Sequence, residues 1–203
     1  MEQDKFIDIS RLIESKNPRL LRWLPSFVIN YLKRILHQEE INAFLNEHKD
    51  KKNLEFCDEV MKYFNIQVEI NDLHLIPKKG PVILVMNHPL GGMDGIAFIS
   101  VLMHHRPDLK FIVNDLLMNV ENLKDLFIGV NKHGKNNVSV RNQIKNAFDA
   151  DHALCIFPAG LVSRKSKGKV RDLDWKKTFV TYARSLDRTV VPIYIDGKLS
   201  PFF

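Results

Sequence analysis

Hydrophobic and polar positions follow a helical period in the first part of the chain. Between residues 20 and 35 the apolar side chains recur every three or four positions, at Leu20, Leu24, Phe27, Val28, Tyr31, Leu32 and Ile35. This is the spacing of one helix face, and Pro25 must kink the stretch or start a new helix there. Further helices are predicted at 39–48 and 54–64. Residues 1–66 are therefore predicted to form an N-terminal helical segment.

From residue 67 the pattern changes to short apolar runs that alternate with amphipathic stretches. The sequence predicts strands at 67–70, 82–86, 109–113, 127–131, 153–157 and 190–195. It predicts helices at 95–104, 115–125, 138–150 and 174–186. Because strands that alternate with helices usually pair in parallel, residues 67–203 are predicted to form an α/β domain. Its mostly parallel central sheet is expected to be flanked by helices.

Composition is that of an ordinary soluble globular protein, with 45% hydrophobic and 27% charged residues among 203. No apolar run approaches the roughly 18 residues that span a bilayer, and the acidic N-terminus has no apolar core of a signal peptide. Cys57 and Cys155 lie far apart, without metal-binding spacing. They are expected to be buried thiols in a reducing compartment, so the chain is predicted to be cytoplasmic and to hold no metal.

The net charge of +6 is concentrated in one segment. Residues 1–66 hold equal numbers of basic and acidic side chains, whereas residues 164–177 hold seven basic side chains against two acidic ones. Such a segment suits an anionic partner, and it also suits a solvated lysine-rich loop. In the N-terminal segment, Trp23 and nearby arginines flank the apolar face. That face suits either a membrane interface or packing on the domain core.

A short segment between a predicted strand and a predicted helix carries candidate chemistry, and it reads Asn87-His88-Pro89-Leu90-Gly91-Gly92-Met93-Asp94. Pro89 excludes His88 from helical geometry, and the two glycines allow a tight turn in which His88 and Asp94 meet. Open α/β sheets bind ligands at this end of their strands. A histidine oriented by a carboxylate takes a proton from a substrate hydroxyl or amine. Alternatively, Asp94 is only a helix N-cap and His88 only a hydrogen-bonded loop residue; the spacing does not separate the two.

A second loop follows the strand predicted at 153–157, and it reads Phe157-Pro158-Ala159-Gly160-Leu161-Val162-Ser163-Arg164-Lys165. It leaves the sheet on the same side as His88 and leads into the basic segment. The sequence holds no phosphate-binding glycine motif and no Gly-x-Ser-x-Gly element. Nucleotide hydrolysis, dinucleotide binding and α/β-hydrolase chemistry therefore lack support.

At these places the chain resembles the glycerolipid (lysophosphatidic acid-type) acyltransferase superfamily. That family has a His-x4-Asp motif, a Phe-Pro-Glu-Gly-Thr-Arg-Ser motif and a Val-Pro motif; the counterparts are His88 to Asp94, Phe157 to Arg164, and Val191-Pro192. The resemblance covers residues 67–203. It departs from the family in a His–Asp gap of five residues and in Ala159, where the family has glutamate. Residues 128–132 lie near the place of a further family motif but match it poorly, so no role is transferred to them.

The residues of these two loops are similar to those of a bacterial branch of the family that is linked to amino-acid-containing lipids. The resemblance implies transfer of a fatty acyl group from acyl-CoA or acyl carrier protein to a hydroxyl of a lyso-lipid, without cofactor or metal. His88 would act as general base and Asp94 would orient it, with backbone N–H groups near Gly91-Gly92 or Gly160 as oxyanion donors. The implied substrate-binding residues are Asn87, Gly91, Gly92, Phe157, Pro158, Gly160, Ser163, Arg164 and Lys165, with Lys167 and Lys169 as weaker candidates.

Such an enzyme would be peripheral on the inner face of the cell membrane. Similar domains continue for another strand and helix, so the chain is expected to lack a C-terminal part or to be a short family member. Two other functions are considered: a non-catalytic lipid- or membrane-surface-binding protein on the same fold, and a nucleic-acid binder. His88 and Asp94 count against the first. An isoelectric point near 9.3 suggests the second, but 9% aromatic residues and one compact basic segment count against it. No nucleic-acid partner is predicted.

Overall fold

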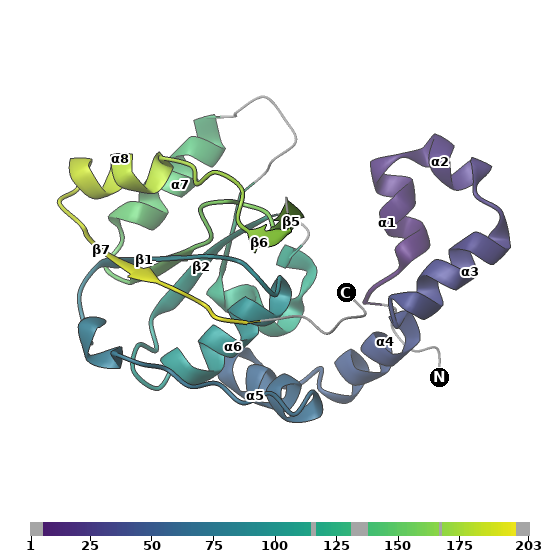
Figure 1. Cartoon of the computed structure of the whole chain (residues 1–203), viewed down its shortest axis with the longest axis horizontal. Helices are drawn as coiled ribbons and strands as arrows, with labels where there is room; N and C mark the ends of the chain where they lie inside the picture. The colour runs from purple at the N-terminus through teal and green to yellow at the C-terminus, as the bar shows by residue number, and fades with distance from the viewer. Residues whose placement is uncertain (1–5, 115–116, 131–137, 167, 198–203) are drawn as a thin grey trace. The chain divides into compact units, whose positions relative to one another are not determined.

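The computed structural model describes residues 6–114, 117–130, 138–166 and 168–197 (Figure 1). The chain forms two compact units that divide between Lys51 and Lys52, whereas the sequence pattern placed the change of character after residue 66. Helix α5 (Asn53–Tyr63) lies in the second unit because its apolar side chains are buried against α6 (Gly92–Leu102). The last residue of the strand predicted at 127–131 and the weaker candidate Lys167 lie outside the described residues, as does Lys132, to which no role was transferred.

In its described residues, 6–51, the first unit contains four short helices, α1 (Ile9–Lys16), α2 (Pro18–Trp23), α3 (Ser26–Ile35) and α4 (Gln38–Glu47). Pro25 separates α2 from α3, as predicted for a residue that cannot continue a helix. Helix α1 falls within the segment predicted to be helical, although no bounds were predicted for it. It is capped by Asp8, whose side chain accepts the N–H groups of Ser10 and Arg11. Two buried amides on α4 bind the α1 end of the chain: Asn42 pairs with both backbone polar atoms of Ile7, and Gln38 accepts the Ile9 N–H at 2.9 Å.

The second unit is built on a five-stranded sheet in which every pair is parallel. Its strands are β1 (Val82–Met86), β2 (Leu109–Asn114), β3 (Phe127–Val130), β4 (Ala153–Ile156) and β7 (Thr189–Ile193), in the order β3-β2-β4-β1-β7. All five residues of β1 are buried, which is why that strand reads as a continuous apolar run. The predicted α/β fold with a parallel sheet is confirmed.

Helices cover both faces of this sheet (Figure 1). On one face, α7 (Val138–Asp149) and α8 (Thr178–Ser185) pack Phe148 and Ala183 against Ile83 and Leu154. On the other, Phe98 of α6 meets Phe111 of β2 edge to face, with ring centroids 6.3 Å apart. The remaining elements are three short 3-10 helices, η1 (Leu73–Leu75), η2 (Leu117–Asn119) and η3 (Glu121–Leu126), and an antiparallel hairpin of β5 (Arg164–Ser166) and β6 (Lys169–Arg171).

Three predictions of secondary structure need correction. Residues 67–70 form no strand, because Val68 is exposed and the segment has no strand beside it among the described residues. The helix predicted at 115–125 is, where it is described, the pair η2 and η3. The hairpin β5–β6 was missed because its residues are mostly charged and exposed, so no apolar alternation marks it.

A fully buried arginine ties the edge of this unit together. Arg106 has no exposed surface and forms a two-pronged ion pair with Asp108, with N–O distances of 2.8 and 2.7 Å. It also donates to the carbonyl oxygens of Pro77 and Gly80 at 2.6 and 2.8 Å. The hydrogen bonds from Arg106 hold the pKa of Asp108 below its ordinary value of 3.8. This network fixes the segment before β1 to the turn before β2.

Candidate active site

The ring of His88 and the carboxylate of Asp94 meet just beyond the end of β1. The His88 Nδ1 and Asp94 Oδ2 atoms are 2.9 Å apart. The Asp94 side chain is fully buried, and the His88 side chain is 18% exposed. A carboxylate bound to Nδ1 holds the proton on that nitrogen and leaves Nε2 as a proton acceptor. The ring of Phe157 stacks on His88 with centroids 4.1 Å apart, which fixes the plane of the imidazole.

Asp94 is not the N-cap of the following helix, which corrects the alternative interpretation. Helix α6 begins at Gly92, its N-cap is Gly91, and Asp94 lies in the first turn. Gly91 has φ +68° and ψ −133°, a conformation that side-chain-bearing residues rarely adopt. This turn starts the helix early and points Asp94 Oδ2 at His88 and at the Leu90 N–H, which donates at 2.9 Å.

The charge of Asp94 has little compensation in the described part of the chain. Its Oδ1 atom is buried without a hydrogen-bond partner there, and its only ion-pair partner among those residues is His88. The helix N-terminus stabilises a negative charge in this first turn. A buried, weakly compensated carboxylate also stabilises the imidazolium that forms when His88 takes up a proton. The arrangement thus suits proton abstraction from a substrate.

Asn87 and Leu90 bind the segment that follows β7. The side chain of Asn87 donates to the Ile195 carbonyl oxygen at 2.9 Å and accepts the Ile195 N–H at 2.6 Å. A Cβ atom at Gly197 would lie 2.6 Å from Leu90 Cδ1, so the Leu90 side chain would have to shift to admit a larger residue there. Asn87, which was predicted to bind substrate, therefore uses its amide to hold the loop.

The second predicted loop lies against the first. The Ser163 N–H donates to the His88 carbonyl oxygen at 2.8 Å. Gly160 has φ +67°, and its N–H donates to the Phe157 carbonyl oxygen at 2.9 Å within a turn. The Gly160 N–H is thus engaged in that turn. The first N–H groups of α6, at Gly92 and Met93, begin a helix and have no acceptor within it.

One residue of this region was not singled out from the sequence. Asp172 accepts the His88 N–H at 3.1 Å, the Ser163 hydroxyl at 2.5 Å and the Trp175 Nε1–H at 2.8 Å. In the sequence, Asp172 is one of only two acids in the basic segment 164–177. An acid among basic residues was the signal available in the sequence. The role of Asp172, however, depends on contacts with residues far away in the chain.

The basic residues predicted to bind substrate lie on the hairpin. Arg164 and Lys165 are both exposed, and Arg164 is directly opposite Arg171 in the register. Directly opposed residues of two antiparallel strands share a face, where like charges repel. Lys169 is opposite Ser166, two positions along, so its side chain is on the same face as Arg164 and Arg171. An anion bound to this face would relieve the repulsion.

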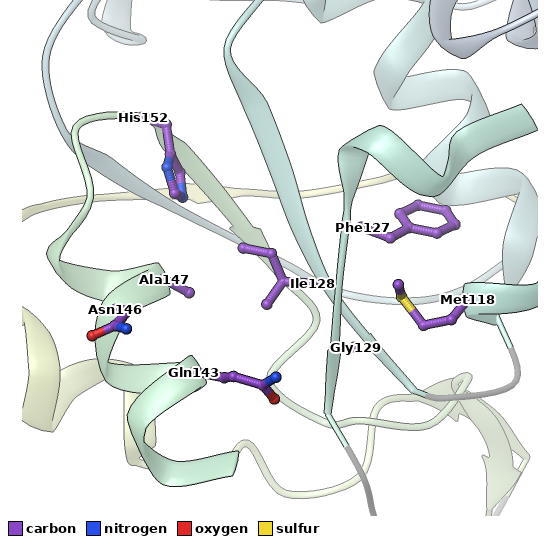
Figure 2. Close-up of a pocket in the computed structure, with 8 residues that line it drawn as sticks. All are labelled: Met118, Phe127, Ile128, Gly129, Gln143, Asn146, Ala147 and His152. Carbon is purple, nitrogen blue, oxygen red and sulfur yellow. The ribbon is translucent and has the colours of Figure 1, made fainter. Parts of the chain in front are cut away.

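A pocket elsewhere in the unit contains none of the predicted site residues. Its volume is about 460 Å³, and it lies between η2, β3 and α7 (Figure 2). Burial, with the Lys110 charge as a smaller cause, lowers the pKa of His152 in its lining below the ordinary value of 6.5. Gly129 faces Met118 there so closely that a Cβ atom would lie 2.8 Å from Met118 Cγ. His88 is not among the residues that line this pocket.

Within the described ranges, no group of three or more His, Cys, Asp or Glu side chains is placed to hold a metal ion. No helix in the same ranges is long and apolar enough to cross a membrane. Both cysteines are buried and free, as predicted. Burial raises the pKa of the Cys57 thiol to about 12 and that of Cys155 well above 9.0, so neither is a thiolate at neutral pH.

Comparisons with known proteins identify the family of the chain. A family model described as an acyltransferase matches residues 11–203. Over 198 residues, 97% of this chain, the sequence is 42% identical to a Bacteroides thetaiotaomicron protein named lyso-glycine lipid O-acyltransferase. It is 40% identical over the same length to a protein of that name from Phocaeicola vulgatus. The matches cover 73% and 71% of the two relatives. The chain belongs to this acyltransferase family and is an O-acyltransferase.

The family resemblance read from the three motifs is thereby confirmed. The match begins at residue 11 and so includes most of the N-terminal helical unit, which the motifs alone did not cover.

Proposed function

We propose that the chain moves a fatty acyl group from a thioester donor to the hydroxyl of a lyso-lipid, with His88 as the general base. The observation that carries the proposal is the 2.9 Å contact between His88 Nδ1 and the fully buried Asp94 carboxylate. The names of the two relatives support a lyso-glycine lipid as the acceptor. The donor is acyl-CoA or acyl carrier protein, and the chemistry needs no cofactor because the thioester itself is activated.

The proposed reaction uses both ring nitrogens of His88 and the carboxylate of Asp94. Asp94 accepts the Nδ1–H of His88, and Nε2 takes the proton of the acceptor hydroxyl while that oxygen attacks the thioester carbonyl carbon. An ester C–O bond forms and the C–S bond breaks. The leaving thiolate then takes the proton from the imidazolium, which returns His88 to its neutral form. With both thiols held protonated, the acceptor hydroxyl supplies the nucleophile.

The developing oxyanion needs donors close to His88. The N–H groups at the start of α6, around Gly92, supply them in this proposal, helped by the positive end of the helix. The positive φ of Gly91 turns the backbone into this position. The exposed basic face formed by Arg164, Lys169 and Arg171 binds the phosphate or carboxylate of the donor or acceptor.

The N-terminal helices support a peripheral location on a membrane surface. On α2 and α3 the aromatic side chains of Trp23, Phe27 and Tyr31 are 87%, 74% and 62% exposed. Exposed arginines lie beside them at positions 19, 22 and 34. Aromatic rings with flanking cations are the composition of a helix that lies in an anionic membrane interface.

Replacing the two most exposed aromatics tests this location. The variant Trp23→Ser/Phe27→Ser is expected to bind vesicles containing anionic phospholipid at least about a hundredfold more weakly, since each ring buries apolar surface worth roughly 1.5–3 kcal/mol. Binding is measured by co-sedimentation, with Tyr63→Ser/Phe64→Ser as the matched control because those two rings are exposed outside α2 and α3. Unchanged vesicle binding, or a lowered melting temperature that shows the rings pack on the protein, would contradict the membrane assignment.

The function itself is tested by thiol release. Wild-type protein is incubated with palmitoyl-CoA or palmitoyl-acyl carrier protein and a panel of lyso-glycine lipid, lyso-ornithine lipid and lysophosphatidate. We expect release that requires an acceptor hydroxyl and is fastest with lyso-glycine lipid. Folded protein that releases no thiol with any pair would overturn the proposal and favour the binding-only alternative.

A further inference from the structure

One carboxylate accepts hydrogen bonds from three segments of the site. Asp172 Oδ1 accepts the backbone N–H of His88 at 3.1 Å and the hydroxyl of Ser163 at 2.5 Å. Asp172 Oδ2 accepts the Nε1–H of Trp175 at 2.8 Å. Because the Ser163 N–H also donates to the His88 carbonyl oxygen, both polar backbone atoms of His88 are held by Ser163 and Asp172.

These two residues flank the basic hairpin. Ser163 immediately precedes β5 and Asp172 immediately follows β6, so their hydrogen bond closes the base of the hairpin. The bonds to the His88 backbone then join this base directly to the residue whose ring binds Asp94. A movement of the hairpin is therefore transmitted to the His88 backbone.

Two carboxylates thus act on opposite parts of one histidine. Asp94 binds the ring at Nδ1, and Asp172 binds the main chain at N. The Asp172 carboxylate makes no ion pair within the described ranges, and its three donors are all neutral. Trp175 fixes one of its oxygens, which leaves the other aimed at His88 and Ser163. Both oxygens of the Asp172 carboxylate are thus engaged by neighbouring residues, which suits a side chain that positions those residues more than one that binds substrate.

We infer that Asp172 is a positioning residue of the acyl transfer: it sets the His88 backbone so that the ring meets Asp94, and it couples that geometry to the basic hairpin. The expected effect on kcat rests on the proposed function. The expected effect on the geometry of His88 rests on the contacts alone. A displacement near 1 Å at a reacting group costs up to about a hundredfold in rate. Loss of the Asp172 contacts should therefore lower kcat and leave KM nearly unchanged.

The kinetic test compares variants that remove one contact at a time. Asp172→Asn keeps the size of the side chain and one acceptor oxygen, but its NH₂ group cannot accept a hydrogen bond. It is expected to lower kcat roughly tenfold to a hundredfold with KM within about threefold. Trp175→Phe, which removes one donor and leaves the oxygen that holds His88, is expected to lower kcat less. A KM rise with unchanged kcat would overturn the inference, because it would place Asp172 in binding.

The structural test does not depend on activity. In protein labelled with ¹⁵N-histidine, the ring nitrogen shifts of His88 are assigned by their loss in His88→Ala. We expect Asp172→Asn to move them while those of His105, whose Nε2 is 2.8 Å from the Ile76 carbonyl oxygen, stay in place. Unmoved His88 shifts would overturn the inference even if the enzyme is active. Moved shifts in a protein without thiol release would support the positioning and overturn only the proposed reaction.

If Asp172→Asn does not fold, a second variant that keeps the carboxylate tests the same inference. Ser163→Ala/Trp175→Phe removes two of the three donors to Asp172 and frees the carboxylate to rotate. It is expected to shift the His88 ring nitrogens and to lower kcat about tenfold, in the same direction as Asp172→Asn. Wild-type kcat and wild-type His88 shifts in this folded variant would contradict the inference.

Discussion

Replacing His88 with alanine is expected to lower kcat for acyl transfer by about 10²–10⁴-fold, the usual contribution of a general base. Nothing else in the described site can take the proton in the same place, because Asp94 is fully buried and makes its hydrogen bonds to His88 and Leu90. The fold should persist, since the backbone bonds of His88 to Ser163 and Asp172 do not need its ring. The measurements are thiol release under saturating substrates and a thermal melt.

A control variant and a double variant are compared with His88→Ala. The exposed His74 serves as the control, and His74→Ala should keep wild-type kcat. If His88 and Asp94 act as one unit, adding Asp94→Asn to His88→Ala should cost little more, because effects within a catalytic unit are not additive. Wild-type turnover in His88→Ala would show that another group is the base. Full additivity would show that Asp94 acts independently of the histidine.

Replacing Arg106 with alanine is expected to cause the largest loss of stability, about 3–5 kcal/mol in the free energy of unfolding. The substitution removes four hydrogen bonds from a fully buried guanidinium and leaves the carbonyl oxygens of Pro77 and Gly80 without this donor. It also leaves a cavity beside the sheet. Urea unfolding of the full chain measures the effect. The exposed Arg184 on α8 is the control, for which a change within about 0.5 kcal/mol is expected.

The Arg106–Asp108 ion pair predicts that the free energy of unfolding depends on pH. Arg106 lowers the pKa of Asp108 in the folded state below 3.8, so the unfolded chain binds this proton more readily than the folded one. The contribution of the pair is then fully present above pH 3.8 and is lost as the pH falls through the folded value. Asp108→Asn should be less stable at neutral pH and should lose less stability on acidification than wild type. Equal acid sensitivity in both proteins would show that Arg106 does not perturb Asp108.

The site could be read from the sequence only in part. The run from Val82 to Met86 is apolar at every position because the central strand of a parallel sheet is covered on both faces. The proline and glycines after it indicate a turn, and that turn does bring His88 to Asp94 across six positions. Because both partners lie within one local segment, the pattern of residues could suggest this contact, although the spacing did not separate it from a helix N-cap.

Contacts between distant segments were decided by the tertiary structure. The sheet order places β1 between β4 and β7, so the loops after these three strands meet at one edge of the sheet. Only this arrangement brings Asp172 to His88 across 84 positions and Ile195 to Asn87 across 108. In the sequence, Asp172 is an acid in a basic segment and Asn87 is a polar loop residue, and neither has a periodic pattern around it.

By itself, then, the sequence determined the family, the α/β fold with its parallel sheet and the approximate positions of the five strands of that sheet. The tertiary structure decided the start of α6, the hairpin β5–β6 and the partners of each polar side chain. The physical reason is that burial and periodicity act on neighbouring residues, whereas a hydrogen bond across the sheet depends on which strands become neighbours.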